Sequence, residues 1–430
     1  IIRLAYVDPT GGLPPSAWGA VLAALGCVFA AATAVLKIYG RRLLSVLKGH
    51  IRLFVSLGLI ACVATLGIVW FAQKDRNPEA VSSGDHSPGV VVLGFDGLDP
   101  SLLERYMKEG KLPHFSRLAR RGLYHRLETT SPPQSPVAWA SFITGRKPEE
   151  HGVLDFLVRD PTTYAPDLVL ADRRDLATPW NGTPFWEEPA VRRYGSTIIR
   201  VPLTFPPPSL NGRLLSGMGV WDARGTQGTY FFYSTGKLPE DPRGMVFPLR
   251  VERGILRGHL PGPYRSGTAD DVRQIFELEL QAERARLSLQ DRTYELTAGK
   301  WSQWIETRFE LGPLGLDAIH VTTRALWWRS EDGEVNLYIS PLNFDPERPS
   351  YPISRPASYA RELHEATGPY HTRGMPYDNV ALSDGVLSDE AFLKQWDTVL
   401  GERERMLSHE LDRFNGGLLV AYFEAPDIIQ

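Results

Sequence analysis

The stretch GVVVLGFDG, residues 89–97, decides the fold of this chain. Its β-branched and leucine run, residues 90–93, ends at a Gly-flanked Asp96. Such a pattern is typical of a buried parallel strand, which brings the following carboxylate to the carboxyl edge of its sheet, where open α/β sheets bind ligands. Taken alone, an Asp at the end of a strand is more often a turn or cap residue. Asp96 is therefore a candidate ligand, and this role is favoured only if other potential ligands or catalytic groups accompany it.

A second stretch, SPPQSPVAW at residues 131–139, supplies a hydroxyl at a helix start. Ser135 is a good N-cap, Pro136 suits the first helical position, and residues 137–144 can continue as a helix until Gly145. Ser135 is then expected at the positive end of a helix, whose free N–H groups can bind an anion such as phosphate. By itself, a Ser before Pro is more often only a cap.

Four motifs in this order resemble the alkaline phosphatase superfamily, specifically its type I phosphodiesterase/nucleotide pyrophosphatase branch. They are GFDG at 94–97, SPPQSPVAW at 131–139, TG at 144–145 and HGV at 151–153. The resemblance covers roughly residues 89–430. It implies an α/β fold with a parallel sheet flanked by helices, and a metal-dependent hydrolase of phosphate esters. His151 belongs to the motif and is interpreted as a structural residue.

The resemblance also implies roles for three residues. Asp96 and Ser135 would share one metal ion, with the Ser135 hydroxyl as the nucleophile. Asp427, which follows the apolar run 418–423, matches the Asp of an Asp-x-x-x-His motif that binds a second metal. The remaining ligands of the family would lie beyond residue 430. We therefore expect a C-terminally truncated chain with about half of a site for two divalent ions, Zn²⁺ being the expected metal, and no activity in residues 1–430 alone.

Departures from the family pattern keep further functions open. Phe156 stands where nucleotide pyrophosphatases of the family usually have an Asn that binds a phosphoryl oxygen, so the substrate is not specified. A sulfatase is one such function, although Val137 and Trp139 occupy the places where formylglycine sulfatases need Pro and Arg. A phospho-alcohol transferase is a second, and a catalytically inactive, membrane-anchored binding protein is a third.

The first 88 residues are predicted to attach the protein to a membrane. Residues 18–36 and 53–72 carry no charge and are long enough to span a bilayer, which predicts a membrane module, 1–72, with helices at about 17–38 and 52–72. The loop between them is basic, which favours a cytoplasmic loop and an extracytoplasmic, periplasmic catalytic domain on a multi-pass inner-membrane protein. Residues 73–88 are polar and rich in Ser, Pro and Gly, as in a linker.

The rest of the chain divides into a core and an insertion. Residues 89–225 are expected to form the first part of the core, 226–345 a β-rich insertion or cap, and 346–430 the second part of the core. Within the core we expect a strand at 123–128 and a long helix over 388–414, with the charged run 402–405 on its solvated face.

Composition excludes several function classes. The chain has 430 residues and a formal net charge of −3, with basic and acidic residues interspersed, so no nucleic-acid binding is expected. The two cysteines, Cys27 and Cys62, lie in apolar runs, which argues against a disulfide scaffold or a cysteine metal site. The expected partners are a phosphate-ester substrate and the lipid bilayer.

Overall fold

The computed structural model describes residues 88–160, 162–169, 178–264, 271–311 and 318–429. The two membrane-spanning helices predicted at about 17–38 and 52–72 lie outside these ranges. Within the ranges, no helix has both the length and the apolar character needed to cross a bilayer.

The centre of the fold is a five-stranded sheet with the order β1-β19-β4-β5-β18. Its first four strands are parallel, and β18 pairs antiparallel with β5. Their bounds are β1 Gly89–Phe95, β19 Gly417–Phe423, β4 Ser196–Ile199, β5 Gly212–Leu215 and β18 Ser354–Arg355. The predicted parallel sheet is confirmed, and its apolar runs pair strands that are far apart in the sequence. The predicted burial of residues 90–93 is wrong in part, because β1 is the edge strand and Val90, Val91 and Leu93 are 57%, 41% and 43% exposed.

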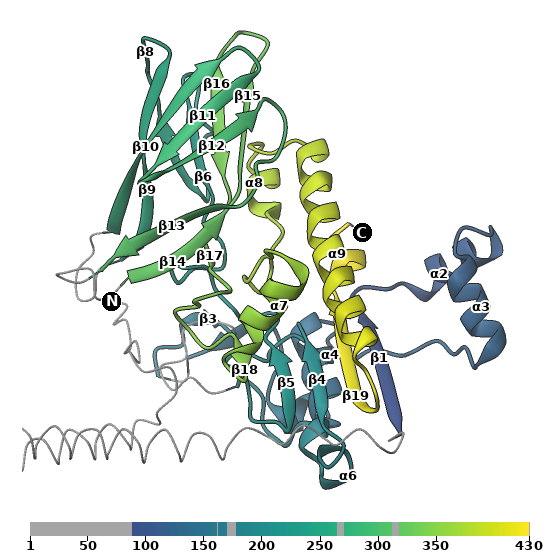
Figure 1. Cartoon of the computed structure of the whole chain (residues 1–430). Helices are drawn as coiled ribbons and strands as arrows, with labels where there is room; N and C mark the ends of the chain where they lie inside the picture. The colour runs from purple at the N-terminus through teal and green to yellow at the C-terminus, as the bar shows by residue number, and fades with distance from the viewer. Residues whose placement is uncertain (1–87, 161, 170–177, 265–270, 312–317, 430) are drawn as a thin grey trace, which may run out of the picture. The chain divides into compact units, whose positions relative to one another are not determined.

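Side chains on the two faces of this sheet enter two different apolar clusters, as the period of two along a strand requires. On β19, Leu419 and Ala421 belong to a cluster that also contains residues of α7 (Tyr359–Thr367) and α9 (Asp389–Asp412). Leu418 and Val420 point the other way, into a cluster with α4 (Ser135–Thr144). The sheet is therefore flanked by helices on both faces (Figure 1).

Short elements connect the core strands. The helices are α2 Pro100–Lys108, α3 Pro113–Arg121, α5 Pro148–His151, the 3₁₀ turn η1 Phe185–Glu187, α6 Pro189–Arg192, α8 Asn379–Ser383 and α10 Ala425–Ile428. A small hairpin pairs β2 Leu157–Arg159 with β3 Pro166–Leu168. Asp99 caps α2 through its side chain, which accepts hydrogen bonds from Ser101 N and Leu102 N.

Residues 231–344 are rich in strands, as the alternating patterns predict (Figure 1). They form a five-stranded sheet (β12-β11-β10-β9-β8), a four-stranded sheet (β15-β16-β6-β7) and a three-stranded sheet (β13-β14-β17). All pairs are antiparallel except β6 with β7. The bounds are β6 Phe231–Ser234, β7 Met245–Pro248, β8 Val251–Glu252, β9 Ile255–Tyr264, β10 Asp271–Gln281, β11 Arg284–Leu289, β12 Arg292–Thr297, β13 Ile305–Glu310, β14 Ala318–Thr323, β15 Ala325–Arg329, β16 Val335–Ile339 and β17 Asn343–Phe344.

The strand predicted at 123–128 is wrong. These residues have no regular secondary structure and make no ladder, and Leu123 and Leu127 are 90% and 93% exposed. The alternation is that of a strand, but a strand needs a neighbour to satisfy its backbone groups, and no described strand lies beside this segment.

The long helix is confirmed, but the predicted solvated face is wrong in part. α9 begins after Ser388, whose side chain accepts a hydrogen bond from Ala391 N. Glu402 and Arg403, however, are only 1% and 2% exposed. They contact His371 and Glu424 inside the protein rather than water, which a helical charge pattern alone does not reveal.

Candidate active site

Asp96 lies where β1 ends, at the carboxyl edge of the parallel sheet. Its backbone N–H donates to Phe423 O at 2.9 Å, which continues the pairing of β1 with β19 by one residue. Gly97 follows with a φ of +60°, so the chain turns sharply and the carboxylate stays at the sheet edge. Its backbone N–H donates to Asp96 Oδ1 at 3.1 Å.

Ser135 lies against Asp96, although 39 residues separate the two. Ser135 Oγ donates a hydrogen bond to Asp96 Oδ1 at 3.2 Å. The predicted N-cap role is off by one residue, since Gln134 is the N-cap and Ser135 is the first residue of α4. The Ser135 side chain therefore does not cap the helix and is free to reach the carboxylate. Gly145 ends α4 with a φ of +64°, as predicted.

Trp139 seats α4 on the sheet. Its ring packs edge-to-face on Tyr422 of β19, with centroids 4.8 Å apart, and it also contacts Phe142. Gly94 of β1 pairs in register with Tyr422. A Cβ at Gly94 would lie 2.4 Å from Trp139 Cη2, so only glycine leaves room for the ring. This contact, one helical turn after Ser135, holds the serine at the sheet edge.

We expect Gly94→Ala to lower the free energy of unfolding by about 1–3 kcal/mol, because the added methyl overpacks the site of Trp139. Gly122→Ala is the matched control, since its Cβ would meet only Leu118 O at 3.6 Å. Urea unfolding of both variants measures the difference. If Gly94→Ala were as stable as Gly122→Ala, close packing of the Trp139 ring against Gly94 would be refuted.

Tyr422 is a site residue that sequence analysis missed. Its hydroxyl donates to Asp96 Oδ2 at 2.7 Å, and the residue is 3% exposed. Burial raises the pKa of Tyr422 well above its usual value, and the negative charge of Asp96 raises it further. The phenol is therefore protonated at neutral pH and orients the carboxylate. Asp96 Oδ1 accepts hydrogen bonds from Gly97 N and Ser135 Oγ, and Oδ2 accepts one from the Tyr422 hydroxyl.

Asp427, on the short helix α10, lies beside the same turn. A Cβ at Gly97 would be 2.8 Å from Asp427 Oδ1. Burial raises the pKa of the Asp427 carboxyl, and the negative charge of Asp96 raises it further. Within the described part of the chain, neither carboxylate has a Lys, Arg or His within the 4.0 Å of an ion pair. Two carboxylates of like charge, without such a partner, suit a bound cation.

The donor set fits part of a divalent metal site. Asp96, Asp427 and Ser135 offer oxygen ligands, which Zn²⁺ and similar ions accept. Among the residues that the structure describes, however, no group of three or more His, Cys, Asp or Glu side chains is placed to hold an ion. Ser135 thus contacts Asp96, and Asp427 lies beside the turn at Gly97; these residues are fewer than a complete two-metal site requires.

A buried ion pair supports the segment that carries Asp427. Arg403 Nη2 of α9 lies 2.8 Å from Glu424 Oε1, with side chains 2% and 9% exposed. Trp396 Nε1, also on α9, donates to Ala425 O at 3.1 Å. These contacts join α9 to the connection between β19 and α10. Only the tertiary structure reveals them.

His151 has the structural surroundings that its motif suggests. It is fully buried, Val153 N donates to its Nδ1 at 3.1 Å, and its Nε2 lies 2.9 Å from Ser141 Oγ. Burial lowers its pKa, so the ring is neutral at physiological pH. Phe156 is half-buried and packs against the cluster on the α4 face of the sheet.

Comparison with known families agrees with this geometry. Residues 90–286 match the family model described as type I phosphodiesterase / nucleotide pyrophosphatase. This segment belongs to that family. The phosphodiesterase segment lies within the alkaline phosphatase superfamily and contains Asp96 and Ser135, whereas Tyr422 and Asp427 come from outside the matched range. No curated protein and no solved structure matches the chain.

Proposed function

We propose that this protein is a metal-dependent phosphodiesterase-like hydrolase in which Ser135 is the nucleophile. The observation that carries the proposal is the contact of Ser135 Oγ with Asp96 Oδ1 at 3.2 Å, at the carboxyl edge of a parallel sheet. The family match supports hydrolysis of phosphate esters in general. The nucleophile, the two-metal site and the preference for diesters are our proposal.

The chemical problem is that a phosphate ester and its attacking group both carry negative charge. Bound divalent cations, Zn²⁺ being the expected ones, would lower the pKa of the attacking hydroxyl and offset charge on the phosphoryl oxygens. Asp96 and Ser135 would hold one cation, and Asp427 would hold the second. The hydrogen bond from Tyr422 would keep Asp96 in a single orientation.

Ser135 would then act in two displacement steps. The Ser135 hydroxyl would lose its proton to solvent water in the presence of the bound cation, and its Oγ would form a bond to phosphorus while the bond to the leaving alcohol oxygen breaks. The leaving oxygen would take up a proton from water. Water next breaks the Oγ–P bond and restores the hydroxyl. The N–H groups of the first turn of α4, where Pro136 has none, would donate to the phosphoryl oxygens.

For the membrane attachment and the domain organisation, the proposal follows the sequence patterns alone. We propose that residues 17–38 and 52–72 anchor the protein in the inner membrane, with the catalytic domain on the periplasmic side. We also propose that residues 226–345 act as an insertion or cap on a core made of 89–225 and 346–430.

The test is an assay of the complete protein that contains this chain, on a phosphate monoester, a phosphate diester and a sulfate ester, each as its p-nitrophenyl derivative. We expect hydrolysis that a chelator abolishes and Zn²⁺ restores, with the diester preferred. Residues 1–430 alone are expected to be inactive, because the described residues offer only two carboxylates and a hydroxyl to the metals.

Three different outcomes of this assay would each identify a different function. Faster turnover of the sulfate ester would indicate a sulfatase. Transfer of the phospho group to an added alcohol, with little release to water, would indicate a transferase. Binding of the diester by the complete protein without any turnover would contradict the proposal and favour a binding protein.

A further inference from the structure

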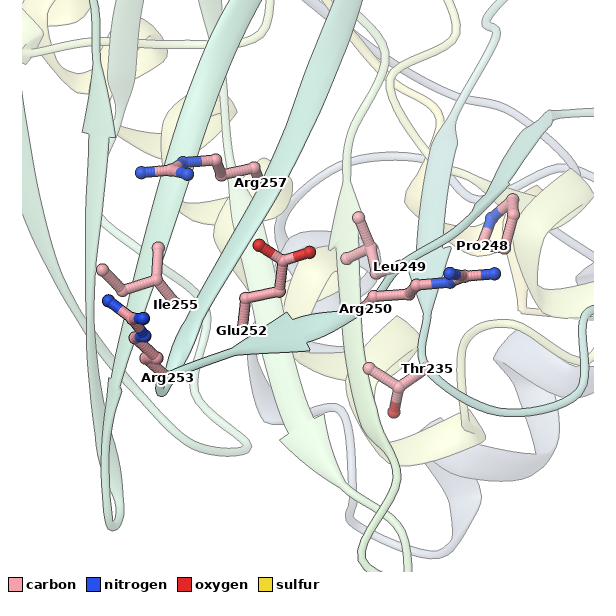
Figure 2. Close-up of a pocket in the computed structure, with 8 residues that line it drawn as sticks. All are labelled: Thr235, Pro248, Leu249, Arg250, Glu252, Arg253, Ile255 and Arg257. Atoms are coloured by element: carbon pink, nitrogen blue, oxygen red, sulfur yellow. The ribbon is translucent and has the colours of Figure 1, made fainter.

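A pocket of about 870 Å³ lies in the strand-rich region, outside the candidate active site. It is formed where β7 ends and the hairpin of β8 and β9 begins. Arg250, Arg253 and Arg257 line it together with Glu252, and Leu249 and Ile255 add apolar surface (Figure 2). The concentration of guanidinium groups around one hollow is the feature that needs an explanation.

The charges of this pocket do not cancel. Arg257 Nε lies 2.8 Å from Glu277 Oε1, so this arginine is paired. For Arg250 and Arg253, by contrast, no carboxylate lies within ion-pair distance in the described part of the chain. Both are exposed, and Glu252 is the only acidic residue of the lining. The pocket therefore carries an excess of positive charge.

Arg253 also occupies a backbone position that arginine rarely takes. It forms the tip of the β8–β9 hairpin with Gly254, and their φ angles are +53° and +81°. Tight hairpins with two such residues favour Asn-Gly or Asp-Gly. An arginine at this position costs backbone energy that Asn would not. Ala282 and Gln290 take similar φ angles of +48° and +55° at neighbouring turns, so the backbone angle is compatible with a role for the Arg253 side chain but does not require one.

We propose that this pocket binds a small organic anion that carries two separated anionic groups, such as a bisphosphate. Its volume suits a small molecule, since ligand pockets span roughly 300–1,000 Å³. Figure 2 shows Glu252 near the middle of the view, with Arg253 and Arg257 to one side and Arg250 to the other. Two groups apart avoid the Glu252 carboxylate better than one compact anion, and Leu249 and Ile255 can contact the scaffold between them.

The experiment is a calorimetric titration at low salt of protein that has been stripped of metal with a chelator and then dialysed into chelator-free buffer. The probes are fructose 1,6-bisphosphate, citrate and inorganic phosphate. We expect saturable binding of the bisphosphate, at least about tenfold tighter than that of inorganic phosphate, because two guanidinium groups are engaged at once. Citrate tests whether carboxylate groups can take the place of phosphate groups. If citrate bound more tightly than the bisphosphate, the proposal that the ligand is a bisphosphate would be overturned.

Three variants make the test specific. Arg250→Gln with Arg253→Asn should weaken bisphosphate binding by roughly tenfold, and Asn suits the backbone at the hairpin tip. Glu252→Gln should tighten it by about threefold, because a like charge is removed. The control is Arg284→Gln with Arg329→Gln, two exposed arginines of the same strand-rich region that lose the same charge; binding should change by less than about twofold.

The proposal is overturned by equal weakening in the control pair, because binding would then follow net charge rather than the pocket. It is also overturned if the bisphosphate shows no saturable binding, or if Glu252→Gln weakens it. Thermal unfolding of each variant checks that the fold is intact. Prior removal of metal excludes metal-dependent binding at Asp96 and Ser135, so the result does not depend on the proposed function.

Discussion

Ser135→Ala is expected to lower kcat of the complete protein on a phosphate diester by about 10³-fold or more, because it removes the atom that forms the bond to phosphorus. The loss of Oγ also removes the donor to Asp96 Oδ1. KM should change far less than kcat, since the substrate's remaining contacts are kept. Steady-state kinetics with the p-nitrophenyl diester measures both constants.

Two further variants show whether the loss is specific to this hydroxyl. Ser141→Ala, on the same helix, removes the contact with His151 and should cost about 1 kcal/mol of stability while kcat stays within about twofold. Ser135→Thr keeps a hydroxyl and should retain more activity than Ser135→Ala. Equal rates for the native protein and Ser135→Ala would remove Ser135 from the mechanism.

Arg403→Met is expected to lower the free energy of unfolding by about 3–5 kcal/mol, because it leaves the Glu424 carboxylate buried without its partner. The two side chains are 2% and 9% exposed and meet at 2.8 Å. Met keeps most of the buried aliphatic volume, so the loss measures the charge rather than a cavity. Urea unfolding followed by tryptophan fluorescence gives the value.

A double variant and a surface control define this prediction. Arg403→Met with Glu424→Gln removes both charges and should cost less than Arg403→Met alone. Arg361→Met breaks an exposed pair with Glu365, whose side chains are 53% and 64% exposed, and should change stability by less than about 0.5 kcal/mol. The Glu424→Gln single variant completes the cycle. If the double variant lost as much unfolding free energy as the two single variants together, a coupled buried pair would be refuted.

The local part of this site could be predicted from the sequence. The run that ends at Asp96 and the SPV motif at Ser135 each specify an element and its end, so their meeting at the sheet edge follows from a parallel sheet. The one-residue error at the start of α4 goes with a tertiary contact that local sequence does not show. Ser135 Oγ donates to Asp96, a partner from another element, instead of capping its own helix, and Gln134 holds the N-cap position without a side-chain capping bond.

The remaining features depend on pairing between distant segments. Tyr422 is 326 residues from Asp96, and within the run 418–423 it is indistinguishable from an apolar strand residue. The burial of Glu402 and Arg403 likewise depends on partners elsewhere in the chain: Glu402 Oε1 lies 3.0 Å from His371 Nδ1, and Arg403 pairs with Glu424. The local pattern of apolar and polar residues does not specify strand register or contacts between distant segments.

The central claim is that Ser135 attacks phosphorus from its position beside Asp96. The most direct test is to quench the complete protein in acid during turnover of a diester, digest it with a protease and measure the masses of its peptides by mass spectrometry. The account predicts that the phosphoryl group, with its remaining ester substituent, is attached to Ser135 and is absent from Ser135→Ala. Turnover with the phosphoryl group attached to another residue would contradict it.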